Sequence, residues 1–256
     1  MENILVISSA MGVTQDFYKN IAQYLLKNNI TVVTFDYTGI GSSLSGKIKE
    51  CQATLLNWGI EDLNTVLKYC LQKFKNIPLS ILGHSIGGSL IGLSQNSIHA
   101  KTIILTCTQS GYWGHWSGFS KIKMWSYWNI LFPILIDTIG YMPSRLFSPM
   151  HNLPKNVAKD WNLWCNSKTY LFQHIDSSHQ FYSKYNSKLI SYSVSDDEYA
   201  PKKAVDWLVN KFRNIDRISI HISPDDYNQK RLGHFGLFNI KLQDTFWVDI
   251  RNDILD

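Results

Sequence analysis

A serine between two glycines, directly after an apolar segment of strand length, constrains this chain more than any other feature. Gly83 and Gly87 each stand two positions from Ser85, and the residues that follow can form a helix. A serine in this strand–turn–helix setting adopts positive φ, where side chains two positions away would collide. The turn raises the hydroxyl above the sheet and directs the N–H of Ile86 toward a developing oxyanion. We therefore predict that Ser85 is a nucleophile.

Strand-like and helix-like segments alternate on both sides of this turn. Apolar, β-branched runs predict strands over 3–8, 30–35, 79–83, 102–107, 189–194 and 217–224. Apolar spacing of three and four predicts a helix over 56–75, and further helices are expected over 15–28, 203–212 and 241–254. Such alternation is typical of a doubly wound, mostly parallel sheet with helices on both faces. We expect an α/β fold with about six strands.

The loop after the first strand carries a candidate oxyanion donor. Serine hydrolases built on such sheets take their second oxyanion N–H from this loop. Counting back from Tyr18 selects Met11. The alternative interpretation is that Met11 is only a loop residue that faces the core.

Between about residues 108 and 188 the composition changes and the alternation stops. Six of the nine tryptophans lie in this stretch, together with many other aromatic residues. We predict a single domain in which residues 1–107 and 189–256 form the core and residues 108–188 form a helical cap or lid inserted after the strand that follows the nucleophile helix. Aromatic linings suit apolar substrates. The apolar run 125–142 also leaves open peripheral contact with a membrane, although Asn129, Pro133, Asp137 and Gly140 interrupt it as a membrane span.

Two adjacent aspartates follow the predicted strand 189–194. In the common pattern, the triad acid stands four residues before a proline at a helix start, and Asp197 has this spacing to Pro201. Asp196 stands five residues before it and fits only a turn that is one residue longer. We favour Asp197 as the acid and expect the other aspartate to bind backbone N–H groups of the loop.

Two histidines lie after these aspartates, and only one fits the role of a general base. His221 lies inside a predicted strand, whereas the base must reach the serine from the loop beyond that strand. His234 lies in that loop between Gly233 and Gly236, which allow a close approach. We predict the triad Ser85, Asp197 and His234.

Charge and cysteine content exclude several classes of protein. The formal charge of +5 arises from 25 basic and 20 acidic residues that are scattered along the chain, so a nucleic-acid-binding stripe is not expected. The four cysteines (Cys51, Cys70, Cys107 and Cys165) are far apart, which favours reduced thiols, a cytoplasmic location and no metal cluster. The first residues have no features of a secretory signal.

In their order, these motifs resemble the α/β-hydrolase superfamily, in its serine-aminopeptidase-like and monoacylglycerol-lipase-like branch. The segments 11–13, 35–41, 83–85, 109–113, 195–201 and 233–236 look like a bacterial family of predicted α/β-hydrolases. The resemblance implies the fold and the triad, and it leaves the substrate open. Members of this fold usually carry an antiparallel strand pair before the first strand found here, so the strand 30–35 is predicted at the edge of the sheet.

The motifs predict a serine hydrolase that needs no cofactor. Ser85 would attack the carbonyl of an ester or thioester with an apolar acyl or alkyl part, through an acyl-enzyme that water hydrolyses. An acyltransferase that uses the same triad is the first alternative, and a non-catalytic small-molecule-binding protein is the second. A peptidase is less favoured, because no carboxylate cluster offers a site for an amino terminus. The oligomeric state and the chain length of the substrate stay open.

Overall fold

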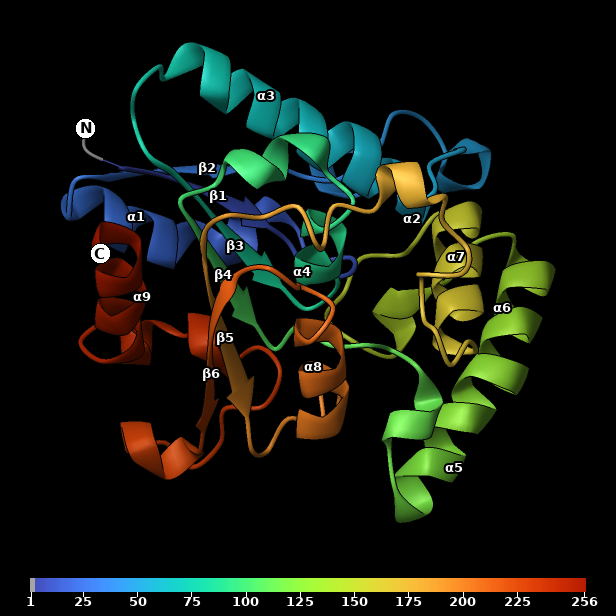
Figure 1. The fold of residues 1–256 in the computed structure, drawn as a ribbon. Helices are drawn as coiled ribbons and strands as arrows, with labels where there is room; N and C mark the ends of the chain where they lie inside the picture. Colours follow the sequence, from blue (N-terminus) through green and yellow to red (C-terminus); the bar gives the residue numbers. More distant parts are fainter. Residues whose placement is uncertain (1–2) are drawn as a thin grey trace.

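A six-stranded parallel sheet forms the centre of the molecule, as predicted. The computed structural model describes residues 3–256. Its strands are β1 (Asn3–Ser8), β2 (Ile30–Thr34), β3 (Leu79–His84), β4 (Thr102–Thr106), β5 (Lys188–Val194) and β6 (Asp216–Ile222). They pair in the order β2-β1-β3-β4-β5-β6, and each named pair is parallel (Figure 1). The prediction that the second strand lies at an edge is therefore confirmed.

The sequence of each strand explains its place in the sheet. Every residue of β1, β3 and β4 is buried, as expected for strands that are covered on both faces. The edge strand β2 is half-buried beyond Ile30, and the other edge strand, β6, is mostly exposed. Because β3, β4 and β5 are adjacent and parallel, their carboxyl ends lie side by side at one edge of the sheet. Ligands bind at this edge in such folds.

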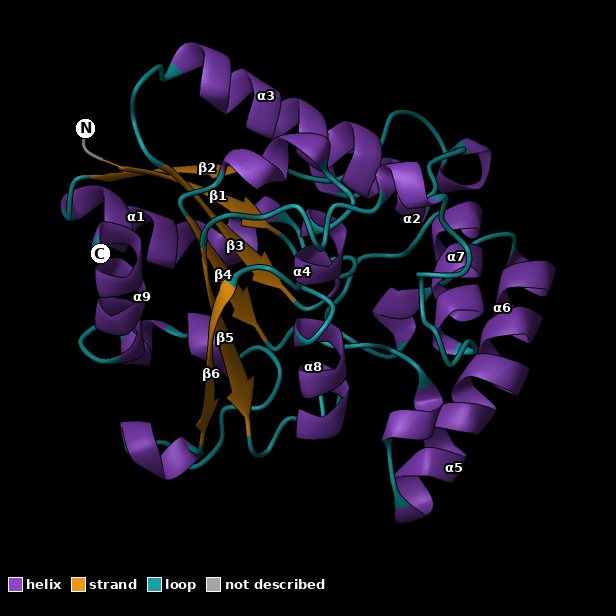
Figure 2. Ribbon diagram, in the orientation of Figure 1, coloured by secondary structure: helices purple, strands orange, loops and turns teal. Residues whose placement is uncertain are grey.

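Helices cover both faces of the sheet (Figure 2). On one face lie α1 (Lys19–Lys27) and α9 (Phe246–Leu255), which contact each other. On the other face lie α2 (Leu55–Asn57), α3 (Asn64–Lys73), α4 (Ile86–Ile91) and α8 (Lys202–Val209). A π-helical turn at Trp58–Leu63 joins α2 to α3, so the predicted helix 56–75 is one irregular rod.

Three predicted helix boundaries were wrong. The helix predicted from Gln15 begins as a 3₁₀ turn and becomes α-helical only at Lys19. The helix after Pro201 ends at Val209. The last helix begins at Phe246, because the Asn239 side chain accepts a hydrogen bond from the N–H of Lys241 and closes a separate 3₁₀ turn. Such local side-chain bonds compete with the helix.

Residues 108–188, which we call the cap segment, leave the sheet after β4 and return to it at β5. They contain α5 (Gly118–Ser126), a π-helical turn at Tyr127–Leu131, α6 (Phe132–Ile139) and α7 (Lys155–Cys165). Trp128, Phe132 and Trp161 pack edge to face at the centre of these helices, with ring centroids 4.6–5.6 Å apart. The segment therefore has its own aromatic core, beside the end of the sheet (Figure 1).

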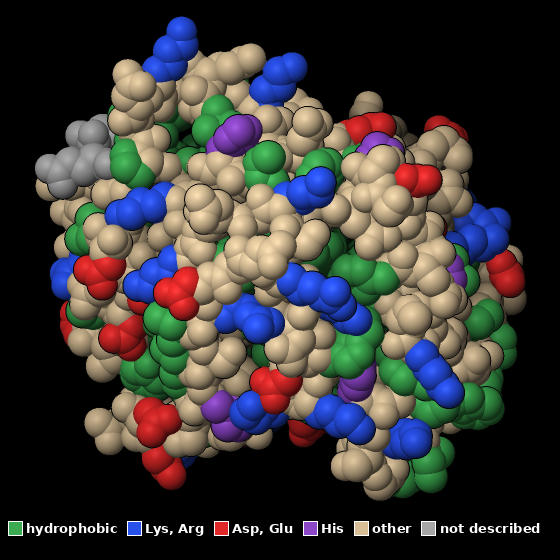
Figure 3. Space-filling view, in the orientation of Figure 1, with side chains coloured by type: hydrophobic (Ala, Val, Ile, Leu, Met, Phe, Trp, Pro, Cys, Tyr) green, Lys and Arg blue, Asp and Glu red, His purple; other side chains and the backbone are tan. Residues whose placement is uncertain are grey.

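The outer surface of the cap segment carries several exposed apolar side chains. Phe119, Ile122 and Trp125 of α5 and Ile130 and Ile134 beyond it are all exposed, with exposed fractions of 42–80%. Figure 3 shows hydrophobic side chains on the surface over α5 and α6, at the lower right of the view, with lysines and arginines among them. Within residues 3–256, none of the helices has the length and hydropathy that a membrane crossing requires.

Candidate active site

The turn between β3 and α4 holds Ser85 in a strained conformation. Ser85 has φ 55° and ψ −124°, and its N–H donates to the carbonyl of Thr106 on the neighbouring strand (3.0 Å). A Cβ on Gly83 would lie 2.4 Å from Cα of Gly88, and one on Gly87 would lie 2.1 Å from the carbonyl oxygen of Ser8. Only glycine fits these two positions, which is the steric reason for the glycine spacing around the serine.

The loop after β1 packs directly against this turn. The Ser8 hydroxyl donates to the carbonyl of Gly87 (2.8 Å) and contacts the hydroxyl of Tyr37 (2.6 Å). Among the residues that the structure describes, neither Met11 N–H nor Ile86 N–H has a hydrogen-bond acceptor. Both residues are buried where the loop meets the turn. Their N–H groups are therefore two donors without a partner in the described protein, which a ligand oxygen could accept.

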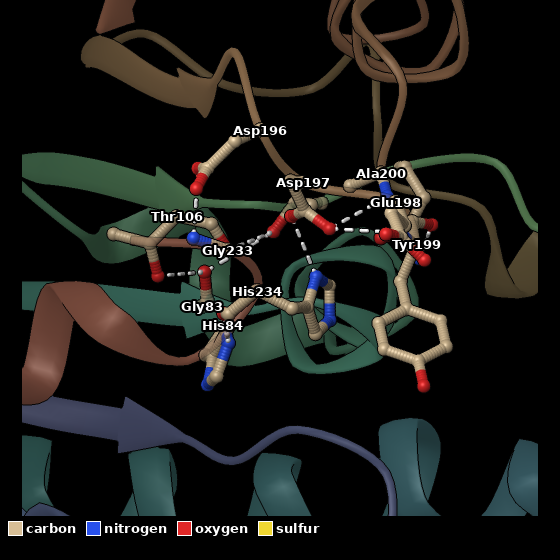
Figure 4. Close-up of polar contacts among 12 residues, drawn as sticks. Gly83, His84, Thr106, Asp196, Asp197, Glu198, Tyr199, Ala200, Gly233 and His234 are labelled. Atoms are coloured by element: carbon tan, nitrogen blue, oxygen red, sulfur yellow. Dashed lines mark hydrogen bonds and ion pairs between the residues drawn. The ribbon is translucent and has the colours of Figure 1, made fainter. Parts of the chain in front are cut away.

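Asp197 and His234 form a buried hydrogen-bonded pair (Figure 4). The Nδ1 of His234 donates to Oδ2 of Asp197 at 2.7 Å. The other carboxylate oxygen of Asp197 accepts the N–H groups of Tyr199 (2.8 Å) and Ala200 (3.0 Å). Because Nδ1 carries the proton, Nε2 is left as the free base.

Asp196 turns away from the imidazole. Its carboxylate accepts the backbone N–H groups of Leu232 (3.1 Å) and Gly233 (2.8 Å), just before His234 (Figure 4). The two adjacent aspartates therefore have different partners. Asp197 faces the His234 side chain, and Asp196 binds the backbone of the loop that carries His234.

A hydrogen-bonded chain connects the β1 loop to the histidine loop through His84. The Nε2 of His84 faces the carbonyl oxygen of His234 at 2.9 Å, so we assign the proton to Nε2. Nδ1 then accepts the hydroxyl of Tyr18 (2.8 Å), whose oxygen accepts the N–H of Ala10 (3.0 Å). The residue next to Ser85 thus contacts both loops that carry candidate site residues.

Burial sets the protonation states of these groups. Burial, together with the nearby His234, lowers the pKa of His84 to about 3, so its ring is neutral at pH 7. Burial opposes ionisation of Asp197, but the facing imidazole and the N–H donors outweigh it and hold the pKa of that carboxyl below its ordinary value. A neutral His84 and an ionised Asp197 are the states that the hydrogen bonds require.

The structure brings Asp197 and His234 together, and Ser85 is buried as well. The exposed fractions of Ser85, Asp197 and His234 are 7%, 5% and 8%. Within residues 3–256, no hydrogen bond joins the Ser85 hydroxyl to the imidazole. His221 lies on β6, where its Nδ1 contacts the Ser193 hydroxyl at 2.8 Å.

Cys107 is a neighbour of the pair that sequence reasoning missed. Its Sγ, a carboxylate oxygen of Asp197 and a ring nitrogen of His234 all lie within 4.8 Å of one another. A metal site would also have such a spacing, but His234 Nδ1 already donates to Asp197 and the thiol is buried. A signal was present in the sequence, because Cys107 follows its strand as directly as Ser85 follows β3.

The cap segment contacts the β1 loop next to Met11. The N–H of His151 donates to the carbonyl of Gly12 at 2.7 Å, and Met142 and Leu153 form an antiparallel bridge behind this contact. Gly12 has φ 63°, and a Cβ there would lie 2.9 Å from the carbonyl of His151. The backbone of the cap segment therefore rests on the loop that holds a candidate oxyanion donor.

Comparison with protein families gives one match. Residues 1–139, more than half of the chain, match the sequence profile of a family described as serine aminopeptidase S33. The matched stretch includes Met11, Ser85 and Ile86, and it ends before Asp197 and His234. No curated protein matches the sequence significantly.

Solved structures with low sequence identity share the fold. Monoglyceride lipase from Saccharomyces cerevisiae aligns with a TM-score of 0.68 at 15% identity, over 98% of this chain and 85% of that one. Est1E from Butyrivibrio proteoclasticus, solved with ferulic acid, aligns at 0.61 and 14% identity, over 99% and 90%. A bromoperoxidase from Bacillus anthracis aligns at 0.60 and 13% identity, over 100% and 93%. Because their names cover different reactions, these similarities establish the α/β-hydrolase fold and leave the reaction to the site.

Proposed function

Because the chain belongs to the serine aminopeptidase S33 family of α/β-hydrolases, we propose that it is a serine hydrolase with the triad Ser85, Asp197 and His234. The observation that carries the proposal is the buried Asp197–His234 hydrogen bond of 2.7 Å, in a chain that also holds Ser85 on a strained strand-end turn. In the proposal, the pair supplies a base of defined tautomer for the Ser85 hydroxyl.

In the proposed reaction, Nε2 of His234 takes the hydroxyl proton as Ser85 attacks an acyl carbonyl. Asp197 stabilises the imidazolium that forms, and the N–H groups of Met11 and Ile86 bind the oxyanion. The imidazolium then protonates the leaving group, and water attacks the acyl-enzyme to regenerate the serine. The lack of an acceptor for either N–H group among residues 3–256 supports their assignment to the oxyanion hole.

We propose an ester or thioester with an apolar acyl or alkyl part as the substrate. In this proposal, residues 1–107 and 189–256 form the core of a single domain, and the cap segment is its lid. The aromatic core of the cap segment and its exposed apolar surface support an apolar substrate and contact with lipid. The burial of Ser85 and His234 supports a lid that opens to admit the substrate.

The test is hydrolysis of p-nitrophenyl esters from acetyl to palmitoyl by the wild-type protein and by Ser85→Ala and His234→Ala. We expect each variant to lose about 10⁴-fold or more in kcat while its circular dichroism spectrum stays unchanged. Fluorophosphonate should label the wild-type protein and not Ser85→Ala. Product analysis with an added alcohol then separates hydrolysis from acyl transfer. A wild-type protein that is inactive on every ester and unlabelled would contradict the proposal.

A further inference from the structure

One completely buried tyrosine connects the β1 loop to the turn that carries Ser85. Tyr18 lies on the 3₁₀ turn before α1. Its oxygen accepts the N–H of Ala10 at 3.0 Å and lies 2.8 Å from Nδ1 of His84. A buried tyrosine hydroxyl needs polar partners, and both partners here directly precede a candidate catalytic residue. Ala10 precedes Met11, and His84 precedes Ser85.

The hydrogen bonds around this tyrosine have one consistent set of proton positions. The carbonyl oxygen of His234 can only accept, so Nε2 of His84, 2.9 Å from it, is the donor. A neutral imidazole with its proton on Nε2 accepts at Nδ1, and the Tyr18 hydroxyl therefore donates there. Burial raises the pKa of Tyr18 and lowers that of His84, so the hydroxyl keeps its proton and the ring stays neutral.

The bond from Ala10 to Tyr18 also bears on the direction of the Met11 N–H. Tyr18 holds the N–H of Ala10, and the carbonyl of Ala10 accepts the N–H of Val13 at 3.1 Å. The peptide between Ala10 and Met11 is planar and trans, so its N–H points away from that carbonyl. With both sides of Ala10 held, the Met11 N–H has a fixed direction, as a preorganised oxyanion donor requires.

We propose that Tyr18 is a positioning residue, which fixes the β1 loop, the Ser85 turn and the histidine loop relative to one another through His84. The inference rests on the proposed serine hydrolase function, in which these three segments supply an oxyanion donor, the nucleophile and the base. A phenylalanine at position 18 would keep the ring that packs on Phe238, with ring centroids 4.9 Å apart, and would lose only the oxygen. Tyr18→Phe therefore isolates the hydrogen bonds.

The experiment compares Tyr18→Phe with Tyr185→Phe. Tyr185 is the matched control, because it is also buried and its hydroxyl contacts the Ile91 carbonyl (3.0 Å) and the Ser97 hydroxyl (2.8 Å), at the end of α4 that is far from Ser85. Each variant loses one buried hydroxyl. The first readout is kcat and KM, determined separately on the best ester. The second is hydrogen exchange of the backbone amides of residues 9–13 and 232–236, which needs no turnover.

We expect Tyr18→Phe to lower kcat about ten- to hundredfold and to change KM less than about twofold, because misplaced groups lose transition-state contacts. Amide exchange should become about tenfold faster in both segments, although Tyr18 hydrogen-bonds directly only to the first. Tyr185→Phe should keep kcat within about twofold and leave exchange in both segments unchanged. The inference is overturned by wild-type kcat in Tyr18→Phe, by faster exchange in residues 9–13 alone, or by an equal loss of kcat in Tyr185→Phe.

A second pair of variants tests the middle of the hydrogen-bonded chain. His84→Gln keeps an N–H for the His234 carbonyl and an oxygen for the Tyr18 hydroxyl, whereas His84→Leu keeps neither. We expect His84→Leu to lower kcat at least as much as Tyr18→Phe, and His84→Gln to lose clearly less. Adding Tyr18→Phe to His84→Leu should lower kcat no further, because the chain is already broken. Losses that multiply would overturn the inference. If Tyr18→Phe does not fold, equal kcat in His84→Leu and His84→Gln would overturn it.

The two proposals fail in different ways. If the wild-type protein hydrolyses no ester and reacts with no fluorophosphonate, the hydrolase proposal fails, while amide exchange still measures whether Tyr18 couples the β1 loop to the histidine loop. If the esters are hydrolysed and Tyr18→Phe matches the wild-type protein in both readouts, only the role of Tyr18 fails.

Discussion

The strands of the sheet and the helices of the cap segment differ in how they use apolar side chains. In β1, β3 and β4 every residue is buried, so the strand ends that carry Ser85 and Cys107 are held on all sides. In α5 no residue is buried, and Phe119 and Ile122 have exposed fractions of 80% and 62%. The central strands have buried their apolar side chains, whereas the cap segment leaves several of its own exposed.

This difference has a physical consequence for function. Asp197 and His234, a pair that depends on fixed geometry, lie in the buried and closely packed part of the molecule. A surface that must adapt to an apolar ligand gains from side chains without fixed neighbours. The following predictions test where this division holds.

The largest effect is expected at the sheet rim, where the two adjacent aspartates can be compared. Asp197→Asn should lower kcat by about 10³- to 10⁴-fold, because an amide no longer holds the imidazole in the required tautomer. Asp196→Ala should keep kcat within about tenfold but lower the free energy of unfolding by about 1–3 kcal/mol, since two backbone N–H groups lose their acceptor.

Ester kinetics and urea unfolding measure both effects. The Asp197→Asn variant should unfold at nearly the wild-type urea concentration. A folded Asp196→Ala variant that is as inactive as Asp197→Asn would show that the two carboxylates do not have separate roles.

An intermediate effect is expected inside the cap segment, where a buried position can be compared with an exposed one. Trp128→Ala should destabilise the protein by about 3–5 kcal/mol, because Trp128 is buried against Phe132 and Trp161. Ile122→Ser should change the free energy of unfolding by about 0.5 kcal/mol or less. It should nevertheless reduce hydrolysis of an emulsified long-chain ester relative to a dissolved short-chain ester.

Thermal unfolding and paired assays on dissolved and emulsified esters provide the measurement. Lys68→Ser on α3 serves as a control for a surface change outside the cap segment. If Ile122→Ser reduces both activities equally, or neither, the apolar surface of α5 has no role in substrate approach.

The smallest effect concerns the neutral histidine in the buried network. The pKa of His84 is about 3 in the folded protein and 6.5 as the ordinary value. As the pH falls below 6.5, the unfolded chain takes up a proton that the folded protein does not, so stability is lost on acidification. This histidine contributes a slope of about 1.4 kcal/mol per pH unit between these two values.

His84→Gln keeps an N–H donor for the His234 carbonyl but does not titrate. The free energy of unfolding, measured by urea titration from pH 7 to pH 5, should fall less steeply in this variant than in the wild-type protein. If the free energy of unfolding falls equally steeply with pH in both proteins, His84 is protonated in the folded state. A protonated His84 would break the hydrogen-bonded chain through Tyr18.

Much of the fold could be predicted from the sequence, because its signals are local. The apolar runs that form β1 and β3 each stand in a short window, and the glycines around Ser85 mark the turn without reference to distant residues. One boundary that failed, the start of the last helix, lies where the Asn239 side chain competes with the helix for a backbone N–H.

By itself, then, the sequence determined the order of the strands along the chain, the strained serine turn and the histidine loop beyond the last strand. Only the tertiary structure decided that Asp197 faces His234 while Asp196 secures its loop, and that the Cys107 thiol lies within 4.8 Å of both side chains of the pair. Adjacent residues on a turn point in different directions, and a change of one position reverses which of them meets a partner 37 residues away. Such contacts depend on how strand ends are brought together across the sheet, which no local pattern in the chain records.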